Sequence, residues 1–414
     1  MWGVGSYRTL FPGRELEKRG HEVFAHLDKN YLAKWNPHEG NVPLANSLDF
    51  EPGGKVSRTF DADTYVFQRR MEETMAPAIR MLQRQDKFTV YELDDNYDLI
   101  PDGSPAKKVL RDHGDRLRVE WMNDAIAHAD VVTVSTPALK DYYSRYADNI
   151  EVLPNYLDWE MWNDVQPQYE VERPRIHIGW MGWLMWRGHD LEELRSWIGP
   201  WLEEHPEVDF VSIGERRGNA KFLRKVGHVS VHDYLGVPKA QRVTVKAAPF
   251  HELAKITATI DIGLVPLEMT TFNECKSYLK GMEYAACGIP CVASPTEQYR
   301  SFVREGEDGF LAANPEQWRL ALDVLVADEA YRRKLGRAAR EKAERMTIQR
   351  EWRQWEQTWS GSTSAAARTT KTDGSTSTTE MTTTTGDRED SRDSLLTMLE
   401  LAPSIISRPR ITIP

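Results

Sequence analysis

The sequence predicts an α/β protein with two doubly wound domains that face each other across a cleft. Strand-like and helix-like runs alternate along the chain, and the alternation begins again after a stretch rich in proline and charge at 166–175. The length of 414 residues fits two or three domains of roughly 150 residues each. Such a rhythm gives parallel sheets covered by helices. Ligands bind at the carboxyl ends of their strands, so two facing sheets imply a cleft.

The composition excludes several classes of protein. With 40% hydrophobic and 28% charged residues the chain has an ordinary globular composition, and no apolar run approaches the ~20 residues that span a membrane. The net charge of −10 argues against general binding of nucleic acid. The first residues lack the basic and apolar segments of a signal peptide. Cys275, Cys287 and Cys291 fit neither a disulfide framework nor a zinc site, so we expect buried free thiols in a reducing compartment, the cytoplasm.

The first domain is expected at 1–165 and a linker at 166–175. Its strands are expected at 65–68, 88–93, 131–134 and 150–153, and its helices at 75–85, 116–128 and 137–146. Before them come a turn at Gly3-Val4-Gly5, a helix at 7–19 and a second strand at 20–24. Doubly wound domains usually open with a buried strand ahead of such a turn. Nothing upstream supplies it, so we expect the first strand to be missing and the native start to lie upstream.

The second domain is expected at 176–345. Its strands are expected at 176–180, 208–214, 243–246, 260–267 and 290–293, and its helices at 190–204, 250–258, 277–287, 316–327 and 329–345. A tryptophan-rich amphipathic helix follows within 346–360. Residues 361–414 begin with a long run of Ser and Thr that cannot bury enough surface to fold. We therefore expect a disordered tail outside the domains.

Two stretches of the first domain are candidate site segments. The turn ending at Gly5 precedes a helix, so its N–H groups could meet phosphate or sugar oxygens. It is no dinucleotide fingerprint, because Arg8 stands where the third glycine would fall. A tight turn without a ligand is the alternative. Asp94 and Asp95 follow the strand at 88–93 and could orient a hydroxyl, act as a base or bind a metal; the alternative is a cluster of capping and turn residues.

The second domain carries the more specific pattern. Arg187 lies near an expected helix N-terminus, where phosphate is favoured, although it could equally be a surface residue. Lys276, Lys280 and Glu283 share a helical face by their spacing of four and three. A cation and the Ser277 hydroxyl at a helix start suit a diphosphate, and a carboxylate about two turns further suits a ribose diol. The alternative is a Lys280–Glu283 salt bridge on a solvated face. The zinc-protease, serine-hydrolase and P-loop motifs do not occur.

This constellation resembles the GT-B glycosyltransferases, specifically the retaining group called family 4, and most of all a branch common in bacteria and bacteriophages. The resemblance covers roughly 1–359. In the second domain it rests on Ile260–Leu267, Phe272-Asn273, Lys276-Ser277, Lys280, Glu283–Ala286, Gly288–Pro290, Ala293-Ser294 and Asp308–Leu311. In the first it rests on Arg8–Val23, Tyr91–Asp95, Ser135–Pro137 and Leu153–Asn155.

The resemblance implies a role for each candidate residue. Glu283 would hold the donor ribose. Arg187, Lys276, Ser277 and the Gly5 turn would bind the donor diphosphate, Asn273 and Glu274 would contact the donor sugar, and Asp94 or Asp95 would be the catalytic carboxylate beside the reacting sugar. Two positions depart from the family pattern. Cys275 stands eight residues before Glu283, where many members have a glutamate, and Glu192 stands five after Arg187, where they have a lysine.

The implied architecture is a GT-B fold of two facing Rossmann-like domains, with the donor in the second, the acceptor in the first, and the helix at 346–360 packing back across the cleft. The implied reaction transfers a sugar from a nucleoside-diphosphate sugar to a glycan or protein hydroxyl with retention, without a metal or another cofactor. A nucleotide-sugar epimerase of the same fold, and a binding or structural module that has lost catalysis, are the alternatives. The tail is either a plain extension or an arm that docks or accepts sugar.

Overall fold

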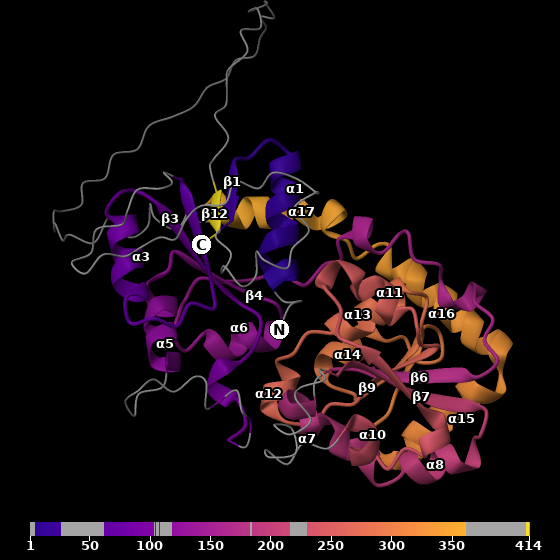
Figure 1. The fold of residues 1–414 in the computed structure, drawn as a ribbon. Coiled ribbons are helices and arrows are strands. Elements are labelled where there is room, and N and C mark those ends of the chain that lie inside the picture. The colour runs from indigo at the N-terminus through magenta and orange to yellow at the C-terminus, as the bar shows by residue number, and fades with distance from the viewer. Residues whose placement is uncertain are drawn as a thin grey trace, which may run out of the picture.

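The computed structural model describes residues 5–25, 62–102, 104, 107, 118–182, 184–215, 230–361 and 411–413. Within these ranges two sheets lie side by side, each flanked by helices (Figure 1). None of the helices in the described ranges is long and apolar enough to cross a membrane.

Among the described residues, each sheet has six parallel strands. The order is β1-β12-β2-β3-β4-β5 in the first sheet and β11-β10-β9-β6-β7-β8 in the second. The first sheet contains β1 (Val23–Ala25), β2 (Thr64–Gln68), β3 (Phe88–Leu93), β4 (Val131–Val134), β5 (Ile150–Val152) and β12 (Ile411–Ile413). The second contains β6 (Ile176–Met181), β7 (Val208–Glu215), β8 (Arg242–Lys246), β9 (Ile262–Val265), β10 (Cys291–Ala293) and β11 (Gly309–Leu311). The expected α/β fold with two doubly wound domains is confirmed.

Helices connect the strands, as parallel pairing requires. In the first domain they are η1 (Ser6–Leu10, a π-helical turn), α1 (Phe11–Lys18), α3 (Met75–Gln83), η2 (Tyr97–Leu99), α5 (Arg118–His128) and α6 (Pro137–Tyr143), and η3 (Trp159–Met161) and η4 (Gln168–Glu170) lead into the second. The second domain has α7 (Leu184–Arg195), α8 (Ile198–Glu204), α10 (Val231–Tyr234), η5 (Lys239–Gln241), η6 (Phe250–Glu252), α11 (Leu253–Thr257), α12 (Thr271–Glu274), α13 (Leu279–Ala286), α14 (Glu297–Phe302), α15 (Pro315–Ala327) and α16 (Glu329–Ala343). The last helix of the described ranges is α17 (Ile348–Trp359).

The cores lie between the sheets and their helices. In the first domain α3 and α5 bury Ile79 and Met122 against β2, β3 and β4. In the second domain α8 and α15 bury Trp201 and Trp318 against the sheet. A further cluster of buried side chains runs from Tyr7 at the start of the chain into the second domain. The two domains therefore share apolar packing, and their relative position is set by contact as well as by the linker.

The gap expected in the first sheet is filled from the other end of the chain. β12 lies between β1 and β2 and is parallel to both, with Ile411 opposite Val23 on one side and Thr64 on the other. The expectation of a missing first strand is therefore wrong, and 411–413 is not part of a tail outside the domains. The sequence Ile411–Ile413 has good strand propensity, but a three-residue run carries no sign of such distant partners. The rest of the tail, for which we expect disorder, lies outside the described ranges.

Helix α17 returns the chain to the first domain. It packs against α1, as the orange and indigo helices show in Figure 1. Trp355 and Trp359 are fully buried. Polar contacts support the packing, because Thr64 Oγ1 donates to the Trp359 carbonyl at 2.7 Å and His21 Nε2 lies 2.7 Å from Glu356 Oε1. Both ends of the chain thus contribute to the first domain.

Candidate active site at the domain interface

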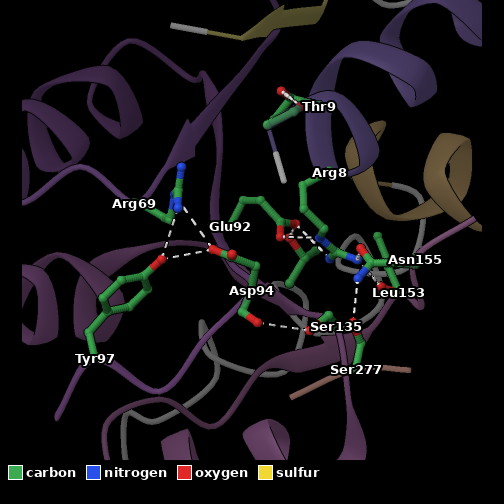
Figure 2. Close-up of polar contacts among 12 residues, drawn as sticks. Arg8, Thr9, Arg69, Glu92, Asp94, Tyr97, Ser135, Leu153, Asn155 and Ser277 are labelled. Atoms are coloured by element: carbon green, nitrogen blue, oxygen red, sulfur yellow. Dashed lines mark hydrogen bonds and ion pairs between the residues drawn. The ribbon is translucent and has the colours of Figure 1, made fainter. Parts of the chain in front are cut away.

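A buried carboxylate follows β3 at its carboxyl end. Asp94 is 8% exposed, and its Oδ1 accepts a 3.0 Å hydrogen bond from the Tyr97 hydroxyl and lies 3.5 Å from Arg69 Nε (Figure 2). The Asp94 carboxylate raises the pKa of Arg69, so the guanidinium stays charged beside it. The Asp94 carbonyl accepts a hydrogen bond from Ser135 at 3.2 Å. The Asp94 side chain is thus held by side chains at the strand ends, whereas neighbouring Asp95 is partly exposed.

A fully buried ion pair lies beneath this carboxylate. Arg8 Nε and Nη2 donate to the two Glu92 carboxylate oxygens at 2.6 and 3.0 Å, and both side chains are 0% exposed. Arg8 also donates to the Leu153 carbonyl and lies 4.8 Å from the Trp355 ring. Burial raises the pKa of Glu92 to about 7, although Arg8 and a hydrogen bond from Thr133 lower it. Arg8 therefore ties the first helix to β3, to the end of β5 and to α17.

The proposed ribose ligand is a buried residue of α13. Glu283 is 1% exposed, its Oε1 accepts from the Tyr7 hydroxyl at 3.0 Å and its Oε2 from Lys280 Nζ at 2.8 Å. The Tyr7 ring packs edge-to-face on Phe11 and Phe250, with centroids 5.3 and 5.7 Å away. Burial and then the Glu283 carboxylate raise the pKa of Tyr7. The alternative Lys280–Glu283 salt bridge is present, but Glu283 lies inside the domain interface and not on a solvated face.

Three further hydrogen bonds join the first domain to the segment before α13. Asn155 Nδ2 donates to Ser277 Oγ at 2.7 Å (Figure 2), and Thr136 Oγ1 donates to the Cys275 carbonyl at 2.9 Å. Asn96 Nδ2 lies 3.5 Å from Cys275 Sγ, and burial raises the pKa of that thiol. The carboxyl ends of β3, β4 and β5 therefore contact the stretch where the sequence predicted diphosphate binding.

Two residues that the sequence predicted to bind the sugar donor are held by an acidic residue of α7. Asn273 Nδ2 donates to Asp190 Oδ1 at 2.8 Å and to the Glu268 carbonyl at 2.7 Å. Lys276 Nζ lies 3.6 Å from Asp190 Oδ2 and 4.6 Å from the Phe272 ring centroid. The expected helix at 190–204 is in fact two helices, so Asp190 lies within α7 and not at the start of a helix. The expected helix at 277–287 also begins later, at Leu279, so Lys276 and Ser277 lie just before it.

The other predicted site residues lie apart from these contacts. Glu274 Oε2 accepts a 2.8 Å hydrogen bond from the Glu297 backbone N–H at the start of α14. Gly5 precedes η1, and its carbonyl accepts from Thr9 Oγ1 at 2.7 Å. Arg187 lies within α7, but its side chain belongs to a stretch, 185–188, whose side chains lie outside the description.

Several residues of the site were not marked by the sequence. Tyr7 and Arg8 belong to the segment that resembles the family, but nothing local indicates that they contact Glu283 and Glu92. Arg69 and Asp190 lack a motif altogether. Among the described residues, no group of three or more His, Cys, Asp and Glu side chains is arranged to hold a metal ion.

Comparison with known proteins places this geometry in context. Residues 192–357 match a family model described as glycosyl transferase-like. A search of curated proteins finds no match. Among solved structures, a glycosyltransferase from Rickettsia africae is similar with a TM-score of 0.60 at 13% identity, over 87% of this chain and 95% of that one. The fold is that of the GT-B glycosyltransferases.

Two other solved structures support this assignment of the fold. A sucrose-phosphate synthase from Thermosynechococcus elongatus has a TM-score of 0.57 at 15% identity, over 86% of this chain and 92% of that chain. The Anabaena protein HepE, solved in complex with UDP, has a TM-score of 0.51 at 15% identity, over 71% of this chain and 78% of that chain. The family match also contains the 260–311 stretch that carries most of the sequence resemblance. At these identities the likeness shows the fold alone.

Proposed function

We propose that this protein is a retaining glycosyltransferase, similar to family 4 and to its bacterial and bacteriophage branch, that moves a sugar from a nucleoside-diphosphate sugar to an acceptor hydroxyl. One observation carries the proposal. On a GT-B fold, Asp94 follows strand β3 of the first domain, while Ser277 and Glu283 of the second domain accept hydrogen bonds from Asn155 and Tyr7 of the first. The glycosyl transferase-like match of 192–357 supports the same reaction class.

The donor nucleotide binds to the second domain. The Glu283 carboxylate accepts hydrogen bonds from the two ribose hydroxyls, and the Tyr7 hydroxyl, which donates to Glu283 Oε1, competes with them for one carboxylate oxygen. Donor binding therefore replaces the Tyr7–Glu283 contact and loosens one bond between the domains. HepE, which has a similar fold, was solved with UDP.

The diphosphate is stabilised by protein groups. Lys276, Ser277, Arg187 and N–H groups of the Gly5 turn face it and oppose the negative charge that grows as the sugar departs. With that charge opposed, the reaction proceeds without a metal or another cofactor. Asn273, fixed by Asp190, and Glu274 contact the donor sugar. In the transfer, the bond from the sugar to the diphosphate breaks and a bond to the acceptor oxygen forms on the same face.

The acceptor is a glycan or protein hydroxyl bound by the first domain. Asp94, or Asp95 beside it, orients that hydroxyl and accepts its proton. Arg69 Nε lies 3.5 Å from Asp94 Oδ1 and helps to hold that carboxylate in position. Because the three cysteines are free and buried, we assign the reaction to the reducing cytoplasm. The Ser and Thr residues of 362–410 are candidate acceptors or docking contacts, and the intact mass after incubation with donors tests for added sugar.

Thermal-shift screening against a panel of nucleotide sugars identifies the donor, because a ligand that binds the folded state raises the midpoint of unfolding. Calorimetry with the best hit then compares Glu283→Ala with Glu316→Ala, an exposed glutamate of the same domain. We expect Glu283→Ala to weaken binding by at least tenfold and Glu316→Ala to leave it unchanged. Unchanged affinity in Glu283→Ala, with folding intact, would refute the ribose role.

A second variant removes the hydroxyl that competes with the ribose and keeps the Glu283 carboxylate. Tyr7→Phe deletes the hydroxyl that donates to Glu283, so donor affinity should rise or stay equal while affinity falls in Glu283→Ala. Turnover assays with the donor alone and with the donor plus an acceptor extract distinguish the alternatives. Turnover without acceptor would indicate an epimerase, and binding without any turnover would indicate a module that has lost catalysis.

A further inference from the structure

A polar pocket lies at the edge of the second sheet opposite to the candidate active site. Its volume is about 230 Å³, and its walls include Ile176 at the start of β6, Asp261 just before β9 and Pro290 just before β10. These residues mark the amino ends of three parallel strands. The candidate active site lies at the carboxyl ends, so the pocket is separate from the donor site and does not depend on the proposed function.

Arginines dominate the charge of this pocket. Arg173 and Arg175 come from the end of the linker, and Arg332 and Arg333 come from α16. The acidic residues of the wall are Asp261 and Glu329, so four cationic side chains face two anionic ones. A pocket with an excess of guanidinium groups favours an anion, above all one with several oxygens.

The neighbouring carboxylates do not use all the donors of these arginines. Arg333 Nη2 pairs with Glu329 at 2.6 Å and Arg175 Nη2 with Asp209 at 2.8 Å, but Arg173 Nε lies 3.6 Å from Asp261, beyond hydrogen-bond distance. The Nε groups of Arg173 and Arg175 are buried and make no hydrogen bond within the described ranges. Leaving a buried donor unsatisfied is costly, and a ligand oxygen would remove that cost.

A second sign of uncompensated charge comes from α16. Arg332 donates through Nη1 to the Leu325 carbonyl at 2.6 Å, which is a neutral partner. Burial lowers the pKa of Arg332 despite the Asp261 carboxylate nearby. An anion in the pocket would supply the missing negative charge next to this guanidinium.

We propose that this pocket binds a small phosphate-bearing anion. The volume exceeds that of several waters at roughly 30 Å³ each, yet it lies below the roughly 300–1,000 Å³ of pockets that enclose drug-sized ligands. The size therefore suits a phosphate group with a small substituent. A bound phosphate ties the linker, through Arg173 and Arg175, to α16, through Arg332 and Arg333.

Calorimetry with inorganic phosphate and with glycerol phosphate, at constant ionic strength in chloride, tests the proposal on the full chain. We expect saturable binding in the wild type and at least tenfold weaker binding in Arg173→Gln and Arg332→Gln. Lys334→Gln is the matched control, because Lys334 lies on the same helix but is exposed and outside the pocket. Equal binding in all four proteins, or no binding in the wild type, would overturn the proposal.

Arg173 also holds Gln168 and the Ala258 carbonyl, so its substitution could disturb folding. Hydrogen exchange on the wild type avoids this problem. Phosphate, compared with chloride, should slow exchange several-fold in 168–176 and 325–333 and leave 277–286, beside the donor site, unchanged. Slowing at 277–286 alone would mean that phosphate binds the donor site, and the pocket would then not be the anion site.

Discussion

The two domains have similar sheets but are assembled from the chain in different ways. The second sheet uses consecutive strands from one uninterrupted stretch, β6 at 176 to β11 at 311. The first sheet takes β1 to β5 from the beginning of the chain and β12 from its end, and α17 packs on it after the second domain is complete. The same fold thus depends on local chain order in one domain and on contacts between distant segments in the other.

This difference predicts where the molecule is vulnerable. Contacts between segments that are far apart in sequence carry a larger cost of loop closure than contacts between neighbours. The first domain therefore depends on a few distant contacts made by β12, Arg8 and α17. The second should tolerate the loss of any of them.

Removing β12 should have the largest effect. Deleting 411–414 leaves β1 and β2 without the strand that pairs with both of them. The free energy lost with the hydrogen bonds of β12 is comparable with the roughly 5 kcal/mol free energy of unfolding of a marginally stable domain. We therefore expect the first domain to lose its cooperative unfolding transition. Hydrogen exchange should show fast exchange in 64–68 and 88–93 and preserved protection in 208–215.

The matched control deletes four residues, 376–379, within the Ser/Thr-rich segment. That protein should exchange like the wild type. A synthetic peptide covering 405–414, added to the deletion variant, should restore protection in the first domain. If the 411–414 deletion variant were as protected from hydrogen exchange as the wild type without the peptide, β12 would be dispensable. The proposed difference between the two domains would then be wrong.

Breaking the buried Arg8–Glu92 pair should have the next largest effect. Arg8→Met leaves the Glu92 carboxylate buried without its bidentate partner, which costs about 3–5 kcal/mol in comparable cases. Urea denaturation followed through the first domain measures the loss. Lys18→Met is the control, since the Lys18–Glu160 pair is exposed and such pairs contribute about 0–1 kcal/mol.

The double variant Arg8→Met/Glu92→Met separates charge from packing. It removes both charges together, so it should recover much of the stability lost in Arg8→Met. Equal destabilisation in the single and double variants would mean that the Leu153 and Trp355 contacts of Arg8, and not the ion pair, hold the first domain together.

The smallest expected effect is a dependence on pH that belongs to the first domain. Burial raises the pKa of Glu92 from about 4.5 to about 7, so between these values the folded state binds more protons than the unfolded state. The free energy of unfolding should therefore fall as pH rises from about 4.5 to 7. Glu92→Gln should flatten this slope, and Glu160→Gln, at an exposed glutamate, should not. A slope that survives in Glu92→Gln would assign it to another group.

Much of the fold could be predicted because its signals are local. The strand expected at 88–93 is β3, and the helix expected at 329–345 is α16 within two residues. The errors occur where a boundary depends on packing. One helix was expected at 190–204, but two form there, and that puts Asp190 inside α7, where it binds Asn273 and Lys276.

The candidate site was predictable in its residue types but not in its contacts. Lys276, Ser277 and Glu283 stood out because their spacing suits a diphosphate and a ribose. Tyr7 did not, although it contacts Glu283, because the two are 276 positions apart and an aromatic residue in a helix usually indicates a core.

The sequence by itself determined the alternation of strands and helices that builds two α/β domains, since periodicity and helix spacing are properties of neighbouring residues. The tertiary structure alone decided which strand completes the first sheet, how deeply Glu283 is buried and where the arginines of 173–175 and 332–333 meet. Those outcomes depend on which distant surfaces come into contact, and the burial of a charge is set by everything that packs around it.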